Sequence, residues 1–187
     1  QTSGRILKLT PSGPNLLANP SFELGTTGWS TWHASFEVIT SGRLSNHAAR
    51  ITWEDPGEED PQRHRLSFGD WPGAVPNPKP GDTYVATAWI RGTGKAIGLP
   101  ARLVLREYTA DGARSESTFG SVAMLGEQWQ QVMVMRTIEL ADAANLTVQL
   151  EIDGAGPGLT VDVDDFDLWL NTTAQPAEQP ANANREE

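Results

Sequence analysis

Every second residue from Leu146 to Ile152 is apolar, and the residues between them are Thr, Gln and Glu. Successive side chains of a β-strand point to opposite faces of the sheet. The alternation therefore predicts a strand with one buried and one solvent-facing side. Ala34–Val38 and Ala49–Trp53 alternate in the same way. This period of two constrains the chain to a fold built from sheets.

Further runs rich in apolar and β-branched residues predict strands over residues 84–90, 101–108, 131–137 and 159–170. Turn-forming residues separate these runs, at 80–82 (Pro-Gly-Asp), 111–112 (Asp-Gly) and 154–158. No segment longer than a turn or two has a helical period. Many strands separated by turns predict an all-β protein, an antiparallel β-sandwich.

The 187 residues, of which 38% are hydrophobic, predict one domain with a sizeable core. We place its body at residues 15–170. Residues 1–14 are interpreted as a lead-in strand or linker. Residues 171–187 contain no apolar side chain larger than Ala and are interpreted as a disordered linker or tail. The start at Gln1, without Met or an apolar leader, predicts a mature or excised chain.

The composition excludes several partners and chemistries. A net charge of −10 disfavours nucleic acid and anionic membrane surfaces, because like charges would meet. No apolar run approaches the roughly 20 residues of a membrane-spanning helix. The chain has no Cys, so a thiolate nucleophile, a disulfide framework and a Cys-type zinc site are absent. We expect neither a nucleic-acid nor a membrane partner.

The last predicted strand changes phase at Asp164-Asp165. Val161 and Val163 share one parity, whereas Phe166, Leu168 and Leu170 share the other. The slip predicts a β-bulge at the two carboxylates. A bound cation, with calcium suited to such oxygen ligands, would neutralise carboxylates turned toward the core. Alternatively, the acidic run is the solvent face of an edge strand.

Four motifs occur in order along the chain: "NLLANPSFELGTTGW" from Asn15, "GDTYVATAWIRG" from Gly81, "EQWQQVMV" from Glu127 and "VDVDDFDL" from Val161. Together they resemble carbohydrate-binding modules of the family 4, 9 and 22 type. The resemblance spans the whole predicted body. It implies a jelly-roll, galactose-binding-like fold.

The resemblance also implies a structural calcium that joins the first strand to the last. Carried over by position, the ligands are Glu23, Asp164 and the carbonyl of Ser21, and Asp165 at the phase slip is a further candidate. The family pattern often has another carboxylate just before the strand at 48–53. This chain has Ser-Asn-His at 45–47 instead, so one charged ligand is missing.

Sugar recognition in water needs flat apolar faces and planar polar groups that hydrogen-bond to hydroxyls. The chain has seven Trp, and the resemblance places Trp29, Trp89 and Trp129 in the core. We predict that sugar contacts come from the remaining aromatic residues and from two arginines: Trp71, Trp169, Trp32, Trp53, Arg65 and Arg106.

These candidates differ in what their surroundings indicate. Trp71 lies in a loop rich in Pro and Gly, where a core Trp is rare. Trp169 alternates with Asp167 and is expected on an outer sheet face. Trp53 shares the parity of Ile51, which favours burial. Arg63, Glu107 and Gln131 are further possible hydrogen-bonding residues on strand faces.

Enzyme motifs are missing. The segment Glu151–Asp153 is similar to the start of a catalytic strand in laminarinase-type glycosidases, but glycines replace the second Glu. No Gly-x-Ser-x-Gly elbow or phosphate-binding loop occurs. We therefore predict a non-catalytic module that tethers an attached catalytic or structural domain to a neutral polysaccharide or cell-surface glycan, and an extracellular or secreted bacterial location. The alternative is a structural or adhesion jelly-roll of a larger assembly, such as a bacteriophage tail or virion surface protein.

Overall fold

The computed structural model describes residues 11–112 and 114–172, with residues 114–116 described by their backbone alone. The described chain forms twelve strands: β1 (Trp29–Trp32), β2 (Ala34–Ile39), β3 (Ala48–Trp53), β4 (Arg65–Asp70), β5 (Val75–Pro76), β6 (Thr83–Gly94), β7 (Pro100–Thr109), β8 (Arg114–Phe119), β9 (Ala123–Met124), β10 (Gln130–Thr137), β11 (Ala143–Asp153) and β12 (Leu159–Leu170).

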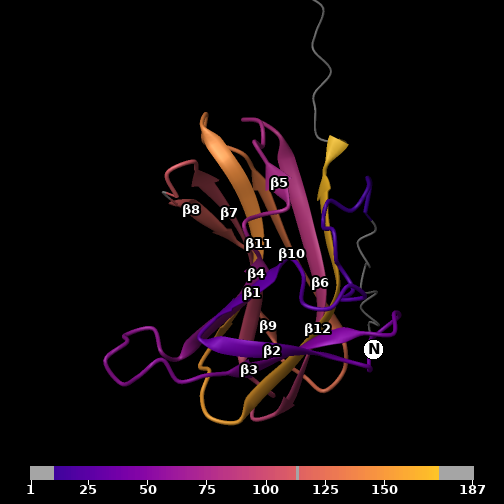
Figure 1. The fold of residues 1–187 in the computed structure, drawn as a ribbon, viewed down its shortest axis with the longest axis vertical. Coiled ribbons are helices and arrows are strands. Elements are labelled where there is room, and N and C mark those ends of the chain that lie inside the picture. The colour runs from indigo at the N-terminus through magenta and orange to yellow at the C-terminus, as the bar shows by residue number, and fades with distance from the viewer. Residues whose placement is uncertain (1–10, 113, 173–187) are drawn as a thin grey trace, which may run out of the picture.

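The strands form two antiparallel sheets. One has the order β1-β4-β11-β7-β8, with β5 paired to β11 and β9 paired to β7. The other has the order β10-β6-β12-β3-β2. In Figure 1, β6 and β12 run beside each other in the five-stranded sheet, as β7 and β11 do in the seven-stranded one. The predicted all-β, antiparallel jelly-roll sandwich is confirmed.

All seven strands predicted from the sequence are present, and the alternation explains their orientation. In β11, Val148, Leu150 and Ile152 are fully buried between the sheets. The opposite face of β11 departs from the prediction, however, because Thr147 is also fully buried and Glu151 is only 3% exposed. The outer face of β11 is therefore less exposed to solvent than the alternation predicted.

An aromatic cluster fills one end of the core and explains the first motif. Phe22 is fully buried, and its ring centroid lies 5.3 Å from that of Trp29. Trp29 stacks on Phe68 at 5.0 Å and packs against Phe166 at 4.7 Å. Phe22 has a φ of 59°, so its backbone turns sharply. The turn places Phe22 in the core while Glu23, its neighbour, stays on the surface.

The phase slip in the last strand is a bulge, as predicted. The register of β12 against β6 shifts between Asp164 and Asp167, and Asp165 has a φ of 46°. β12 lies at the centre of its sheet, and Asp162 and Asp164 are fully buried. The alternative interpretation, a solvated edge strand, is therefore wrong.

Most of the two predicted end segments lies outside the described residues, at residues 1–10 and 173–187. The proposed domain boundaries therefore stay predictions. Within the described part of the chain, no helix has the length and apolar character needed to cross a membrane.

Candidate functional site

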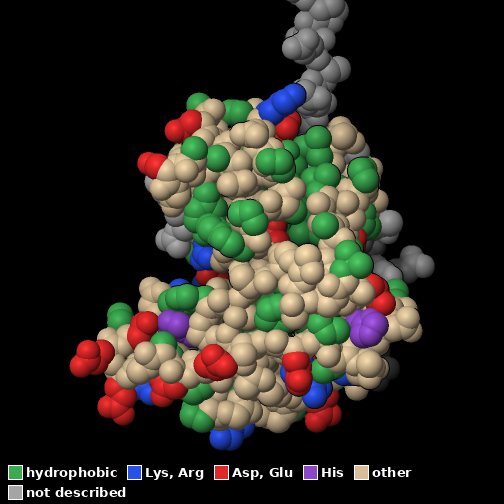
Figure 2. All heavy atoms as spheres, in the orientation of Figure 1, with side chains coloured by type: hydrophobic (Ala, Val, Ile, Leu, Met, Phe, Trp, Pro, Cys, Tyr) green, Lys and Arg blue, Asp and Glu red, His purple; other side chains and the backbone are tan. Residues whose placement is uncertain are grey.

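A groove of about 470 Å³ lies across the outer face of the seven-stranded sheet. Its lining comes from β1, β4, β11, β7 and β8 and from two loops: Trp32, Gln62, Arg65, Ser67, Trp71, Arg106, Tyr108, Ser117, Phe119, Gln149 and Glu151. Figure 2 shows the molecule hollowed on the left of the view, with basic and acidic side chains in the hollow.

Two aromatic pairs stand at the groove. Trp32 is 40% exposed, and its ring stacks on His33 with centroids 3.4 Å apart. His33 is itself held, by the Arg65 carbonyl oxygen at 3.1 Å and by the Asp60 carboxylate at 3.1 Å. Trp71 is 53% exposed and meets Tyr108 edge-on, with centroids 5.4 Å apart. Each tryptophan ring is therefore partly exposed at the groove and is also packed against a neighbouring ring.

The floor of the groove is polar. The Arg106 guanidinium donates hydrogen bonds to Gln149, Glu151 and the Ser117 hydroxyl, the last at 2.9 Å. Arg106 is 9% exposed and Glu151 is 3% exposed. Because each planar group is held by the next, the floor presents fixed hydrogen-bonding groups to a ligand.

Ion pairs continue along the same face. Arg65 donates through Nε to Asp153 at 2.6 Å, and Arg102 lies 3.4 Å from Glu151 and 3.7 Å from Asp153. The hydrogen bond to Asp153 raises the pKa of Arg65 above its ordinary value. The Arg102 guanidinium also covers Phe119, 4.2 Å from the ring centroid. Together with Arg106, the two arginines thus pair with the carboxylates of Glu151 and Asp153, beside the exposed Phe119.

Asp70 anchors the loop that carries Trp71. Its carboxylate accepts hydrogen bonds from the backbone N–H of Ala74 and of Val148, both at 2.6 Å. The Trp71 N–H donates to the Gly28 carbonyl oxygen at 3.3 Å. Burial raises the pKa of Asp70 to about 6 from an ordinary value of 3.8. The loop is therefore attached to β11 and to the turn before β1.

Asp70 makes the stability of the domain depend on pH. Folding raises its pKa, so protonation favours the folded state; the contribution is fully present below about pH 3.8 and is lost as pH rises through about 6. We expect the unfolding free energy of the wild type, relative to Asp70→Asn, to increase by about 1.4 kcal/mol between about pH 7.5 and pH 5. Urea denaturation at both pH values measures this difference.

The control for this experiment is Asp142→Asn, which changes an exposed carboxylate. Its difference from the wild type should vary much less over the same pH range. If the Asp70→Asn difference stayed constant with pH, the buried carboxylate would not titrate as its surroundings indicate.

The structure brings four of the six predicted sugar-contacting residues to one groove: Trp32, Trp71, Arg65 and Arg106. Trp169 is elsewhere. It is 2% exposed, so the prediction that it contacts sugar is wrong. The segment before β1 covers this part of β12: Leu16 N–H donates to Leu168 O, and Gly13 lies against Trp169.

Trp53 is also buried, at 7% exposure, and its indole N–H donates to the Arg63 carbonyl oxygen at 2.8 Å. It therefore belongs to the core, as its parity indicated, and not to the groove. Glu107 is fully buried and pairs with Arg136, and it does not line the groove. Gln131 lies on the other sheet, in a separate pocket with Trp89.

Of the three tryptophans that were predicted to lie in the core, only one does. Trp29 is a core residue, as predicted. Trp89 and Trp129 are half-buried, and each ring is covered by a guanidinium, from Arg43 at 4.0 Å and from Arg91 at 4.6 Å.

Sequence reasoning missed several groove residues. Gln149 and Glu151 share the polar parity of β11, and this signal could have placed them beside each other. Tyr108 is the last residue of a predicted strand, and nothing else in the sequence indicated that it would line the groove. Phe119 lies in β8, whose sequence RSESTF has no apolar alternation. Nothing in the sequence indicated that β8 would border the site.

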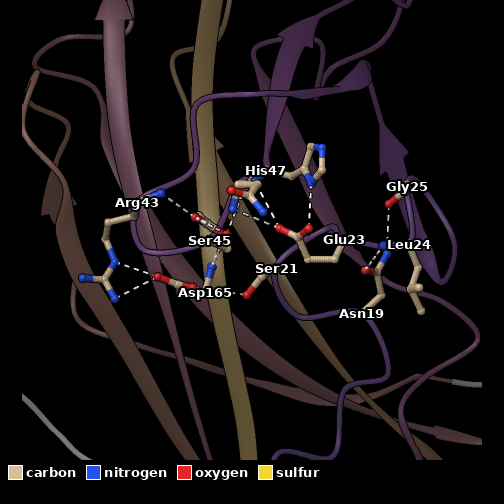
Figure 3. Close-up of polar contacts among 11 residues, drawn as sticks. Asn19, Ser21, Glu23, Leu24, Gly25, Arg43, Ser45, His47 and Asp165 are labelled. Carbon is tan, nitrogen blue, oxygen red and sulfur yellow. Dashed lines mark hydrogen bonds and ion pairs between the residues drawn. The ribbon is translucent and has the colours of Figure 1, made fainter.

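The predicted calcium ligands lie at the bulge of β12 and in the segment before β1, but each carboxylate already has protein partners (Figure 3). Glu23 accepts hydrogen bonds from the backbone N–H groups of Asn46 and His47 at 3.1 Å, and contacts His47 Nδ1 at 2.8 Å. The hydrogen bond from His47 lowers the pKa of Glu23. Ser21 donates its hydroxyl to Asp165 at 3.1 Å. Glu23 thus binds segment 43–47.

Asp164 binds the same segment from the other side, through the Arg43 N–H at 2.7 Å and the Ser45 hydroxyl at 3.3 Å. Burial raises the pKa of Asp164. Over residues 11–112 and 114–172, no group of three or more His, Asp or Glu side chains is arranged to hold a metal ion. Calcium binding at this place stays a prediction.

No protein-family profile matches the chain, and no curated protein matches it in sequence. Solved structures do resemble it. The CBM22-1 xylan-binding domain of Xyn10C from Paenibacillus barcinonensis is 14% identical, with a TM-score of 0.65. The similarity covers 87% of this chain and 97% of that domain.

Two longer proteins contain the same fold. Arabinose-bound MgGH51 α-L-arabinofuranosidase is 19% identical, with a TM-score of 0.64, over 83% of this chain. The enzymatically active domain of bacteriophage CBA120 tailspike protein 4 is 10% identical, with a TM-score of 0.61, over 84% of this chain. This chain spans 26% of the first and 21% of the second. At these identities the likeness shows the fold, which is that of carbohydrate-binding modules.

Proposed function

We propose that this domain binds a neutral polysaccharide or glycan in the groove and does not cleave it. The observation that carries the proposal is the composition of the groove. Four exposed or half-exposed aromatic side chains border it, and fixed Arg, Gln and Glu groups form its floor. Flat apolar faces together with planar hydrogen-bonding groups are what sugar rings require.

The dimensions of the groove favour a polymer. Its lining comes from five adjacent strands of one sheet. At strand spacings of about 4.8 Å, these strands span on the order of 20 Å. Several consecutive sugar rings fit along that length. The net charge of −10 favours a neutral chain over an anionic one.

The carboxylates in and beside the groove are poorly placed for hydrolysis. Glu151 is buried beneath Arg106, and Asp153 is bound by Arg65. A glycosidase needs one carboxyl as acid and a second as base or nucleophile. Both groups here are engaged in ion pairs with guanidinium groups and are not free to take these roles.

We expect the purified domain to bind without turnover. Calorimetry with soluble xylan, galactan, mannan and β-glucan should show affinity for at least one of these neutral chains, and weaker affinity for polygalacturonate. Affinity should rise with oligosaccharide length until the groove is filled. Assays of new reducing ends should show no increase. Release of reducing ends that Glu151→Gln abolishes would contradict the non-catalytic assignment.

A non-catalytic module of this kind would act as a tether. Attached to an enzyme or structural domain, it raises the local concentration of the polysaccharide around that partner. The arabinofuranosidase, in which a similar fold forms part of a longer chain, supports this arrangement. Since polysaccharides and cell-surface glycans lie outside the cell, we propose an extracellular location.

The bacteriophage tailspike similarity favours a second candidate, an adhesion or structural domain on a virion surface. The two candidates differ at the groove. A purely structural role would not require exposed aromatic rings beside a polar floor, so the exposure of Trp32 and Trp71 favours glycan binding. Absence of binding to both neutral and acidic glycans would favour the structural role.

A further inference from the structure

The segment from Arg43 to His47 closes the junction between the turn before β1 and the bulge in β12 (Figure 3). Glu23 binds one end of the segment, and Asp164 and Asp165 bind the other. The contacts join parts of the chain that are more than a hundred residues apart. This is the place where the resemblance implied a calcium ion.

Arg43 makes three kinds of contact at this junction. Its backbone N–H donates to Asp164 Oδ2 at 2.7 Å. Its guanidinium donates to Asp165 Oδ2 through Nε and Nη2, each at 2.8 Å. The flat face of the same guanidinium lies 4.0 Å from the ring centroid of Trp89 in β6. The Arg43 side chain is 14% exposed.

The two adjacent carboxylates need a positive charge. Asp164 is fully buried, and the Asp165 side chain is 18% exposed. Burying ionised groups is costly unless each is paired and hydrogen-bonded. Arg43 contacts both residues, Asp165 through its guanidinium and Asp164 through its backbone N–H, and the Asp165 N–H and Ser45 hydroxyl complete the hydrogen bonds of Asp164.

The donor set does not fit calcium. Calcium binds six to eight oxygen atoms at about 2.3–2.6 Å. Here N–H groups point at the carboxylate oxygens of Asp164, Asp165 and Glu23. An ion among these oxygens would face the positive ends of the N–H bonds, and the guanidinium beside Asp165 would repel it. The missing carboxylate at 45–47 removes a further ligand.

We infer that Arg43 does here what a bound cation would do: its guanidinium neutralises Asp165, its backbone N–H hydrogen-bonds to Asp164, and these contacts close the fold without metal. The geometry of the junction explains why Arg suits this position better than Lys. A guanidinium can donate two hydrogen bonds to a carboxylate while its face rests on an aromatic ring. Lys can supply the charge, but only as a point charge without that planar contact.

Thermal melts of the wild type and three variants test this inference. The wild-type melting temperature should be equal, within about 1 °C, in millimolar calcium and in excess chelator. Arg43→Gln should melt roughly 5–10 °C lower in both buffers, because it leaves the mostly buried Asp165 carboxylate uncompensated beside Asp164. Arg43→Lys should recover part of this loss. Arg50→Ala is the matched control, since Arg91 still pairs with the buried Asp162, and it should lose less than Arg43→Gln.

Two results would overturn the inference. The first is a wild-type melting temperature that falls by several degrees in chelator, which would show that a metal closes the fold. The second is an Arg43→Gln variant that melts as high as the wild type, which would show that the charge is not needed. Calorimetric titration of the wild type with calcium decides the question even if a variant does not fold.

Discussion

Trp71→Ala is expected to weaken binding of the best neutral polysaccharide by about five- to over a hundredfold. An aromatic platform contributes on the order of 1–3 kcal/mol, by analogy with bases that stack on aromatic side chains. Trp71 is 53% exposed at the groove, and its edge-on contact with Tyr108 is its one ring contact with another aromatic side chain in the described chain. Calorimetric titration of the purified variant measures the loss.

The melting temperature of the variant distinguishes loss of a sugar contact from unfolding of the domain. Removing one exposed ring and its contact with Tyr108 should lower the melting temperature by less than about 4 °C. Met133→Ala is the control, because Met133 is 44% exposed on β10 of the other sheet. It should bind like the wild type. A Trp71→Ala variant that binds normally would place the glycan site elsewhere.

Glu107→Ala should reduce the unfolding free energy by about 3–5 kcal/mol, since it leaves the buried Arg136 charge uncompensated. Glu107 is fully buried, and it accepts hydrogen bonds from Arg136 Nε at 2.5 Å and from the backbone N–H groups of Glu139 and Leu140. Arg136 lies on β10, so the pair joins the two sheets. Domains of this size are stable by only about 5–15 kcal/mol.

Urea denaturation measures this loss of unfolding free energy. Two further variants test whether it comes from the buried ion pair. Glu139→Ala removes an exposed partner of Arg136 and should cost less than about 1 kcal/mol. The double variant Glu107→Leu/Arg136→Met replaces both charges with apolar groups and should recover much of the stability. If Glu107→Ala cost no more than Glu139→Ala, the pair would not hold the sheets together.

The strands of the core were predictable because alternation in the sequence is a local property. The seven predicted strands and the bulge at Asp164-Asp165 all follow from the parity of neighbouring side chains. The strands β1, β4, β5, β8 and β9 were not predicted: β1, β5 and β9 are short, β4 has only two apolar side chains, Leu66 and Phe68, and the sequence of β8 has no apolar alternation. The place of β1 and β8 in the sheet depends on their partners β4 and β7.

The candidate site was only partly predictable, because it depends on contacts between distant segments. The composition of the Trp71 loop indicated an exposed ring, which the structure shows. Trp169 has the parity of an outer-face residue, but the segment around Gly13 covers that face. Arg106 meets Glu151 across two strands, 45 residues apart. Sequence alone indicated that each residue was polar and gave no sign that they would meet.

The groove and the Arg43 junction lie on different sheets of the sandwich. The groove crosses the outer face of the seven-stranded sheet, whereas Arg43, Asp164 and Asp165 hold the five-stranded one. Exchanging the exposed rings of Trp32, Trp71 or Phe119 therefore leaves the ion pairs at the bulge untouched. The domain can be diversified at its ligand face, by evolution or in a selected library, while the same scaffold continues to fold.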